Sequence, residues 1–459
     1  MLSKEVVGQV FKKALATGGD FAEIFEEDSI NNDLSLINGN IKDISAGRTY
    51  GIGIRIFKDL KSVYAYTNDN DLNSLLLTAE RAAAAIGDLN KDIDINLMER
   101  VNKNINSILY VPSSVATSKK IQIMKKAYKS AKDYGEEIVQ VQVGYLDKDQ
   151  RVLIANSNGL YTEDRRIRTR IKINSIASNG TENQTGFEGP GRMMGFEIFD
   201  AIDVEAYGKS ASERAVTMLH ARECPAGRMT VAIENGFGGV IFHEACGHSL
   251  EATAVAKGNS VFAGKLGEKI ASSKVTAIDD GTMPNLWGSI NIDDEGTPSQ
   301  KNILIENGVL KSYLVDSFNG RRMNMKSTGS SRRESYKYAP TSRMTNTYIA
   351  NGEDDNDKII ASIEQGLYAK KMGGGSVNPI TGEFNFAVDE GYLVKNGKII
   401  EPVRGASLIG KGSEVLMDID MVGKNLDHGQ GMCGSSSGSV PTNVGQPLIR
   451  VKNITVGGK

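Results

Sequence analysis

The stretch Tyr392-Leu-Val-Lys-Asn-Gly-Lys-Ile-Ile400 has the pattern of a β-hairpin, with two strand-like runs on either side of an Asn-Gly pair. Asn-Gly favours the type I′ turn because both central residues of that turn have positive φ angles. The pair recurs between strand-like runs at residues 38–39 and 307–308, and eight such pairs occur along the chain. We therefore expect a fold rich in antiparallel hairpins.

Helical periodicity is confined to a few segments between these strands. Apolar residues recur on one face of residues 4–16, and residues 72–86 are rich in Leu and Ala. Residues 118–134 and 204–219 are the other helix-like segments, and the first of these carries a run of lysines. Helices and hairpins that alternate in this way predict the α+β class.

A shift in composition near residue 221 indicates a domain boundary, because the chain beyond it contains more Gly and Asp. We predict two domains, an N-terminal α+β domain of residues 1–220 and a C-terminal domain of residues 221–459. Within the second, Gly373-Gly-Gly-Ser376 has the composition of a flexible loop.

The overall composition is that of a globular protein with little net charge. The chain has 459 residues, of which 40% are hydrophobic, so it is long enough for a large buried core. The formal net charge is −2, whereas a surface for nucleic acid or an anionic membrane needs a basic excess. No apolar run approaches the roughly 18 residues of a membrane-spanning helix, the first residues lack the apolar core of a signal peptide, and three cysteines are too few for a disulfide framework. We expect a cytoplasmic protein without direct contact to nucleic acid or membrane.

The strongest chemical signal is His243-Glu244-x-x-x-His248, within Gly239-Val-Ile-Phe-His-Glu-Ala-Cys-Gly-His-Ser-Leu-Glu251. Two closely spaced imidazoles are typical of a metal pair, and an acid beside the first can serve a water molecule on the metal. A spacing of five residues sets the two rings about 140° apart on a regular α-helix. The helix that we expect here, in the C-terminal domain, must therefore widen or end near His248, and Gly247 makes either change easier.

A catalytic zinc ion also needs a third protein ligand and one open position. The candidates are a distant carboxylate, His428 or a cysteine. We favour Cys433, because a thiolate suits zinc and because the glycines on both sides let the backbone approach a metal closely. The remaining residues of these types, His220, His428, Cys224 and Cys246, are then expected to be structural.

Three further groups of polar residues have both a structural and a functional interpretation. Alternating basic residues predict a strand with one basic face, which is either an exposed face or the wall of a chamber for extended peptides: Arg166, Arg168, Arg170 and Lys172. Acidic residues beside glycines can orient the imidazoles, but turn formation is the favoured interpretation for most of them: Asp279, Asp280, Asp293, Asp294 and Glu295. Candidate donors to an oxyanion lie on a strand-like stretch and can equally be sheet structure: Arg343, Asn346 and Tyr348.

Six segments carry a resemblance to a known family: Phe242-His-Glu-Ala-Cys-Gly-His-Ser-Leu-Glu251, Asp279-Asp-Gly-Thr282, Ile292-Asp-Asp-Glu-Gly-Thr297, Arg332-Arg-Glu-Ser-Tyr336, Arg343-Met-Thr-Asn-Thr-Tyr348 and Cys433-Gly434. With them the chain resembles the catalytic TldD side of the TldD/PmbA metallopeptidases, also called modulators of DNA gyrase, over essentially its whole length. The resemblance implies one zinc ion on His243, His248 and Cys433, with Glu244 as catalytic acid and base.

The same resemblance implies partners. Relatives process peptides and unfolded polypeptides in a chamber formed by a dimer, which is a homodimer or a heterodimer with a paralogue that lacks the metal motif. Residues 1–220 would then serve dimerisation and the chamber. One departure is visible, since relatives read Cys-Gly-Lys-x-Gly-Gln where this chain has Cys433-Gly-Ser-Ser-Ser-Gly-Ser439. Ser435–Ser437 therefore replace residues that include the relatives' Lys.

We expect a zinc-dependent peptidase in which Glu244 takes a proton from water and returns it to the leaving amine. Two alternatives belong to other classes. One is a non-catalytic regulatory metalloprotein that acts through a protein partner such as a topoisomerase. The other is a closed structural metal site, with His428 or Cys246 as a fourth ligand.

Overall fold

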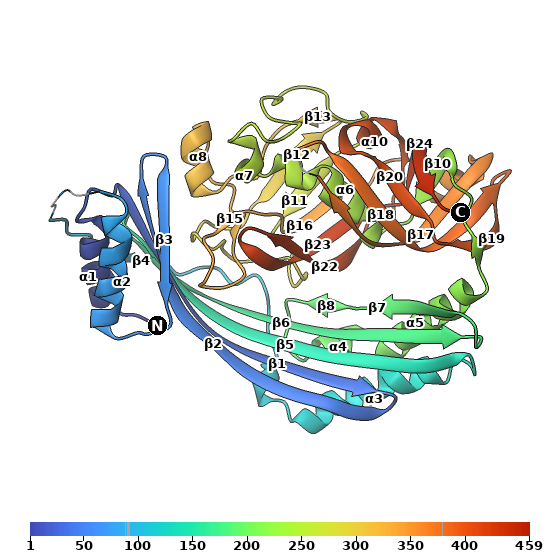
Figure 1. The fold of residues 1–459 in the computed structure, drawn as a ribbon, viewed down its shortest axis with the longest axis horizontal. Coiled ribbons are helices and arrows are strands. Elements are labelled where there is room, and N and C mark those ends of the chain that lie inside the picture. The colour runs from blue at the N-terminus through green and yellow to red at the C-terminus, as the bar shows by residue number, and fades with distance from the viewer. Residues whose placement is uncertain (88, 90–91, 379) are drawn as a thin grey trace.

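The N-terminal half of the molecule forms one large curved sheet (Figure 1). The computed structural model describes residues 1–87, 89, 92–378 and 380–459. The strands of this sheet run in the order β3-β2-β1-β5-β6-β4, and β7 and β8 also pair with β6. Their bounds are β1 Phe21–Ile37, β2 Asn40–Lys58, β3 Lys61–Thr67, β4 Met98–Glu99, β5 Ile138–Asn156, β6 Leu160–Ser178, β7 Asn183–Glu188 and β8 Gly191–Arg192.

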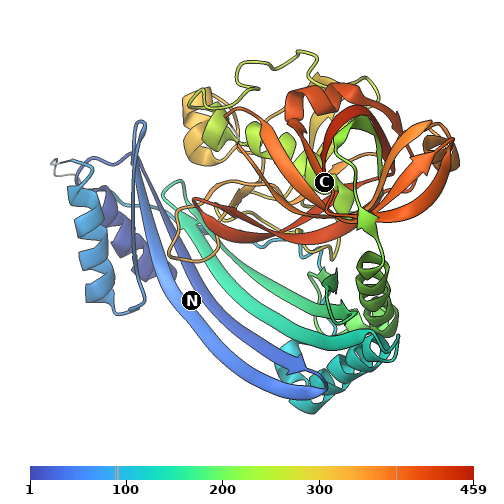
Figure 2. The ribbon, with the colours of Figure 1, turned by 45° about the vertical axis from the view of Figure 1, so that its right-hand side comes forward.

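Helices cover one end and one face of this sheet. The helices α1 (Lys4–Leu15) and α2 (Leu72–Ala84) pack together at one end, whereas α3 (Thr117–Lys132) and α5 (Val204–Leu219) cover the face turned away from the C-terminal half (Figure 2). These four helices confirm the four helical segments predicted from the sequence, each within two residues at either end. The remaining helices of this half are α4 Ile198–Ala201 and the 3₁₀ helix η1 Pro112–Ser114.

Two larger sheets surround a second core in the C-terminal half. One runs β17-β10-β24-β20-β18-β19-β9, and a further pairing of β17 with β18 closes five of its strands into a ring. The other runs β13-β12-β11-β16-β23-β22. The strand bounds are β9 Arg222–Glu223, β10 Gly227–Ile233, β11 Ala277–Asp280, β12 Lys301–Glu306, β13 Val309–Leu310, β14 Ser331–Arg332, β15 Thr341–Ser342, β16 Asn346–Ile349, β17 Gln365–Val377, β18 Glu383–Lys395, β19 Lys398–Arg404, β20 Ser407–Lys411, β21 Ile419–Val422, β22 Asp427–Ser435, β23 Gly438–Gln446 and β24 Ile449–Gly457.

Short helices fill the space around these sheets. They are η2 Phe237–Gly239, α6 Val240–Ala245, η3 Gly247–Leu250, α7 Ala252–Val255, α8 Ser317–Met323, α9 Asn356–Ala361 and α10 Gly412–Asp418. The apolar residues of α6 belong to the same buried cluster as the inner residues of β17, β18 and β24. The segment with the metal motif is therefore anchored in the larger core of the molecule. Among the described residues, no helix combines the length and the apolar character needed to cross a membrane.

The three hairpins expected at Asn-Gly turns are confirmed. Asn38-Gly39, Asn307-Gly308 and Asn396-Gly397 connect β1 to β2, β12 to β13 and β18 to β19. Both residues of each pair have positive φ, from 47° to 84°, as the type I′ turn requires.

The prediction of a flexible loop at Gly373-Gly-Gly-Ser376 is wrong. This segment belongs to β17 and pairs with β18 through several register shifts. A Cβ atom on Gly375 would lie 2.2 Å from the carbonyl oxygen of Asn385. Glycine is needed here because two backbones approach closely, not because the segment is a loop.

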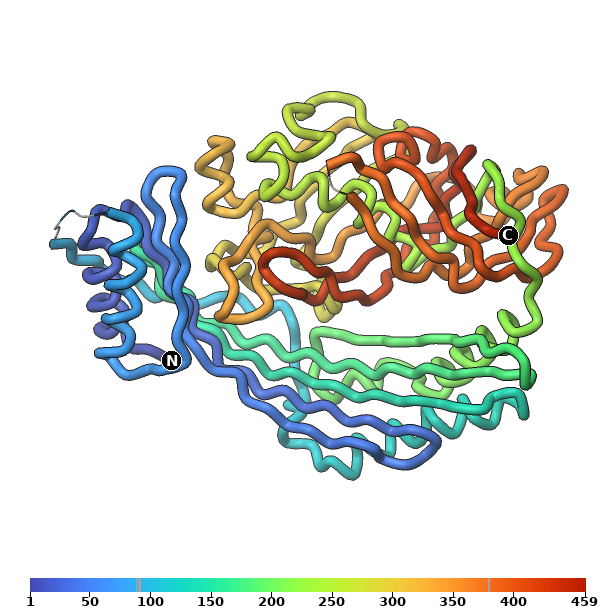
Figure 3. The backbone as a smooth tube through the Cα atoms, in the orientation of Figure 1, coloured from blue at the N-terminus to red at the C-terminus, as the bar shows by residue number. Residues whose placement is uncertain are grey.

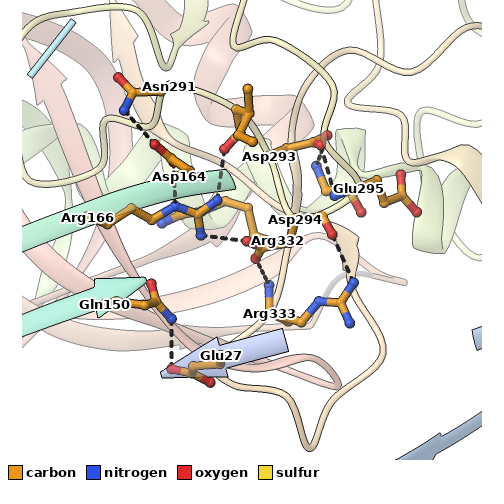
Figure 4. A network of polar contacts seen from close by, with 12 residues as sticks. Glu27, Gln150, Asp164, Arg166, Asn291, Asp293, Asp294, Glu295, Arg332 and Arg333 are labelled. Carbon is orange, nitrogen blue, oxygen red and sulfur yellow. Dashed lines mark hydrogen bonds and ion pairs between the residues drawn. The ribbon is translucent and has the colours of Figure 1, made fainter. Parts of the chain in front are cut away.

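Buried charges join the curved sheet to the C-terminal half (Figure 4). Arg166 on β6 donates to Asp164 on the same strand and to Asp294 of the C-terminal half, at 3.0 and 2.5 Å. Arg333 reaches in the opposite direction and donates to Glu23 on β1 at 2.6 Å. All five side chains are buried. The interface therefore depends on these ion pairs, because a buried charge that loses its partner strongly destabilises a fold.

The basic strand is part of the same interface, so an exposed face is the wrong interpretation for three of its four cations. Arg168 donates to the carbonyl oxygens of Trp287 and Ser289, and Arg170 donates to that of Gln430 on β22. Only Lys172 is exposed. The sequence pattern predicted the basic face correctly, but the loop that covers it lies more than 100 residues further along the chain. The β22–β23 hairpin therefore lies against this sheet (Figure 3).

Candidate metal centre

His243 and Glu244 lie on the short helix α6, and His248 lies on the following 3₁₀ helix η3. The α-helix ends at Ala245, and the next residue, Cys246, has φ −129° and ψ −47°. This break removes the angular separation that a regular helix would impose on the two histidines. Their ring centroids lie 5.0 Å apart, with the ring planes at 82°.

Gly247 allows this break for a steric reason. A Cβ atom at this position would lie 2.2 Å from Met344 Sδ, whereas carbon and sulfur atoms in contact need considerably more space. Any larger residue would displace either Met344 or the neighbouring His248. The glycine predicted to ease a change of helix geometry is therefore at the point where the helix ends.

Cys433 and the two histidines form a compact group. The cysteine lies near the end of β22, and its Sγ is 3.3 Å from Nε2 of His243 and 3.3 Å from Nε2 of His248. The three ligand-type atoms all lie within 4.8 Å of one another. His243 and Cys433 are buried, and the side chain of His248 is 12% exposed.

The neighbouring charges favour a thiolate at this site. Burial alone would raise the pKa of Cys433, but the imidazoles of His243 and His248 lower it to about 3. Burial alone would lower the pKa of His248, but Glu251 and the Cys433 sulfur raise it well above its usual value. Thiolate is the form of cysteine that binds metals. A metal cation can therefore take the place of the imidazole proton beside this sulfur.

The donor set and its spacing fit a zinc ion. With Zn–S near 2.3 Å and Zn–N near 2.0 Å, a tetrahedral ion separates sulfur and nitrogen by about 3.5 Å, close to the 3.3 Å in the structure. In the part of the chain that the structure describes, the group contains only His243, His248 and Cys433, without His428 or Cys246. Three protein ligands leave one tetrahedral position open.

Glu244 lies beside this group. Its Oε2 is 3.6 Å from Nε2 of His248, the nitrogen that faces the sulfur, and its side chain is 23% exposed. It is thus the most accessible of the four side chains.

Glu251 is a functional candidate that the sequence interpretation missed. Its Oε1 lies 3.2 Å from Nδ1 of His248, where it can fix the tautomer and orientation of the ring. The available signal was a glutamate three residues after the second histidine, close enough in a helical turn to reach its ring.

The acids that the sequence offers for this role have other partners: Asp279, Asp280, Asp293, Asp294 and Glu295. Asp279 accepts hydrogen bonds from Thr345 and Thr347. Asp280 accepts from the amide of Thr282, and Asp293 from the amides two and four residues ahead, so both agree with the turn interpretation. Asp294 and Glu295 bind arginines of the interface between the two halves.

The three candidate oxyanion donors are buried: Asn346 and Tyr348 lie on β16, whereas Arg343 lies in the segment between β15 and β16. Asn346 donates to the carbonyl of Asp280 and to Ser289, and the Tyr348 ring packs on His428 with centroids 5.4 Å apart. Arg343 is fully buried, and its side-chain hydrogen bonds go to the β22–β23 hairpin. Their described contacts therefore give these three no place at the open ligand position.

Three family models match the chain in order. They describe domain 1, the central domain and the C-terminal domain of the PmbA/TldA metallopeptidases, and they match residues 22–86, 110–219 and 226–458. The chain belongs to the PmbA/TldD metallopeptidase family. The resemblance inferred from the six sequence segments is thereby confirmed.

Named PmbA/TldD relatives align over nearly the full chain. A metalloprotease TldD homolog of Buchnera aphidicola is 35% identical over 452 residues, which cover 96% of this chain and 93% of the relative. A zinc metalloprotease TldD homolog of Saccharolobus solfataricus is 28% identical and covers 97% and 98%. Among solved structures, TldE from Thermococcus kodakarensis has a TM-score of 0.78 at 20% identity, over 99% of both chains. A protein of Thermotoga maritima has a TM-score of 0.81 at 22% identity, over 99% of this chain and 100% of that one. These structures show that the chain has the fold of the PmbA/TldD proteins.

Proposed function

We propose that this chain is a zinc-dependent peptidase that hydrolyses peptide bonds in peptides or unfolded polypeptides. The proposal rests above all on the convergence of His243, His248 and Cys433 within 4.8 Å, with Glu244 next to them. One zinc ion held by these three side chains would supply Lewis acidity that polarises a peptide carbonyl and acidifies a water molecule. The name of the Saccharolobus solfataricus relative, which includes zinc, supports this choice of metal.

Glu244 is the proposed proton carrier. Its Oε2 takes the proton of the attacking water and then delivers it to the amine nitrogen as the peptide C–N bond breaks. Glu251 holds Nδ1 of His248, so that Nε2 of the same ring points towards Cys433. The chain itself thus provides a positioned base and an oriented ligand set.

An extended peptide is the proposed substrate form. A cleft of about 330 Å³ lies between the curved sheet and the β22–β23 hairpin, and Lys172, Trp287 and Met432 are among its lining residues. Met432 directly precedes Cys433, so the cleft adjoins the strand that carries the proposed sulfur ligand. A wall of strands suits the binding of a peptide through its main chain, which requires little sequence preference.

The wider assignment is a proposal that the sequence and the family resemblance support. We propose that residues 1–220 serve dimerisation and the peptide chamber, with either an identical copy or a paralogue that lacks the metal motif, and that residues 221–459 form the metallopeptidase domain. The small net charge of −2 and the three cysteines support a cytoplasmic protein that does not bind nucleic acid or membrane directly.

The decisive experiment compares zinc content and hydrolysis in one preparation. The purified chain should contain about one zinc ion and cleave an unfolded peptide. Glu244→Gln should keep the zinc and lose about 10²- to 10⁴-fold in rate, whereas Glu268→Gln, an exposed acid outside the centre, should behave like the parent. Equal cleavage by Glu244→Gln would refute the proposed mechanism. A parent protein that holds zinc and cleaves nothing would support the regulatory alternative instead.

A further inference from the structure

Arg343 is a fully buried cation that binds the hairpin carrying Cys433. Its Nη2 donates to the carbonyl oxygen of Cys433, and its Nη1 donates to Ser437 Oγ and to the carbonyl oxygen of Gly438, both at 2.9 Å. One guanidinium thus holds the backbone of the proposed sulfur ligand and the turn that follows it.

The remaining nitrogen of Arg343 faces the other side of the metal centre. Its Nε lies 3.9 Å from Glu251 Oε1, and within the described ranges of the chain this nitrogen has no hydrogen-bond partner. Glu251 in turn lies 3.2 Å from Nδ1 of His248. Arg343 therefore contacts both the strand that carries one ligand and the acid that orients another.

This double contact joins two distant parts of the chain. His248 and Cys433 are separated by 185 residues and belong to different elements, so packing must fix the distance between them. The guanidinium suits this task because it is planar and presents its donors in a rigid fork. A metal centre tolerates displacements of only about 0.5 Å before its geometry suffers.

We propose that Arg343 is a positioning residue of the metal centre, which sets the separation of Cys433 and His248 by holding the Cys433 carbonyl and the Glu251 carboxylate together. The inference rests on the proposed function, because it needs these residues to bind a metal. It assigns Arg343 a role in ligand geometry in place of the oxyanion role considered from the sequence.

Ser437 contacts the same guanidinium. It belongs to the segment in which this chain departs from the family pattern. Its side chain is fully buried, and its hydroxyl contacts Arg343 and, at 3.0 Å, Thr341. Its neighbours Ser435 and Ser436 are exposed. Of the three serines, the one that touches Arg343 is thus the one enclosed by the fold.

Arg332 offers a matched control. It is also buried and donates to two carbonyl oxygens, those of Met344 and Pro441, each at 2.7 Å. None of its described hydrogen bonds or ion pairs involves Cys433 or Glu251. Loss of either arginine removes a buried cation from the same region. Only the loss of Arg343 releases the carbonyl of Cys433 and the carboxylate of Glu251.

The test measures metal binding in Arg343→Lys and Arg332→Lys, with correct folding checked by circular dichroism. Zinc affinity is obtained by competition with a chelator, and the thiolate-to-metal absorption band of the cobalt(II) form reports the geometry of the bond to Cys433. Arg343→Lys should weaken zinc binding about 10- to 100-fold and shift the cobalt band. Arg332→Lys should leave both unchanged, even if its thermal stability falls. Wild-type zinc affinity and cobalt spectrum in Arg343→Lys would overturn the proposal.

A double-mutant cycle adds a second criterion. If Arg343 acts through Glu251, the double variant Arg343→Lys/Glu251→Gln should lose less affinity than the product of the two single losses. If the affinity loss of the double variant equals the product of the two single losses, Arg343 does not act through Glu251. Should Arg343→Lys not fold, Ser437→Ala removes one hydrogen bond of Arg343 and one of Thr341, and it should still weaken zinc binding. An unchanged affinity would contradict the proposal. Absence of zinc binding by the parent chain would instead refute the proposed function.

Discussion

Glu251 Oε1 lies 3.2 Å from Nδ1 of His248, while Nε2 of the same ring faces the Cys433 sulfur at 3.3 Å. Both nitrogens of the ring are thus engaged. Because the carboxylate stabilises the charged imidazole, Glu251→Gln should lower the pKa of His248 in the metal-free protein. An NMR titration of the histidine ring signals measures this shift. An unchanged His248 titration would contradict the assigned contact.

Replacement of the proposed sulfur ligand should remove the metal. Loss of a hydrogen bond that supports a metal ligand weakens metal binding about 10- to 100-fold, and Cys433→Ser should weaken zinc binding by more than this. Equilibrium dialysis followed by metal analysis measures the zinc affinity. Cys246→Ala is the control, because burial raises the pKa of the Cys246 thiol and keeps it protonated. Equal zinc binding by the parent and Cys433→Ser would exclude Cys433 from the ligand set.

A methyl group at Gly247 should disturb the centre through packing alone. Gly247→Ala places a Cβ atom 2.2 Å from Met344 Sδ, and overpacking of this kind costs about 1–3 kcal/mol. Because the strained residue adjoins His248, we expect lower zinc affinity as well as a lower melting temperature. Gly434→Ala is the control, since it adjoins Cys433 but its Cβ would have no atom within 4 Å. Similar zinc affinities for the two variants would argue against a steric role of Gly247.

The buried charges between the two halves predict a specific pH dependence. Burial alone would raise the pKa of Asp294, but Arg166 and Arg333 lower it below its usual value. A carboxyl group whose pKa is lower in the folded than in the unfolded state stabilises the fold at pH values above its unfolded pKa of about 3.9. This stabilisation is lost as the pH falls from there through the folded-state pKa. Asp294→Asn should therefore cost about 3 kcal/mol at pH 7, with the difference from the parent shrinking below about pH 4.

Thermal unfolding at several pH values measures this difference. Asp149→Asn is the control, because Asp149 on β5 forms a two-bond pair with Arg165 on β6 at a more exposed position. Exposed pairs contribute at most about 1 kcal/mol. A destabilisation by Asp294→Asn that stays constant down to pH 3 would show that its charge is not the cause.

Local chemistry explains which parts of the fold were predictable. Asn38-Gly39 and Asn396-Gly397 specify their hairpins through the φ angles that the turn needs, so no distant contact had to be known. The same holds for α5, whose observed bounds equal the predicted segment. In the motif, the five-residue spacing of His243 and His248 required an interrupted helix, since a continuous one would have separated the rings.

What could not be predicted depends on contacts between distant segments. The basic face of residues 166–172 is a local pattern, but its burial depends on the loop around Trp287 that packs over it. Gly375 resembles a loop glycine because its sequence does not reveal the backbone of Asn385 beside it. The contacts of Arg343 with Glu251 and Cys433 likewise span about 90 residues in each direction, and no spacing rule links residues so far apart.

The distance along the chain between the proposed ligands has a consequence for the lifetime of the protein. His248 and Cys433 close a loop of 185 residues, so a bound ion would act as a reversible cross-link between α6 with η3 and the β22–β23 hairpin. Binding to the folded state alone adds to the free energy of unfolding in proportion to the logarithm of the free metal concentration. On the proposed assignment, zinc supply would therefore determine how often this chain opens and becomes accessible to other proteases.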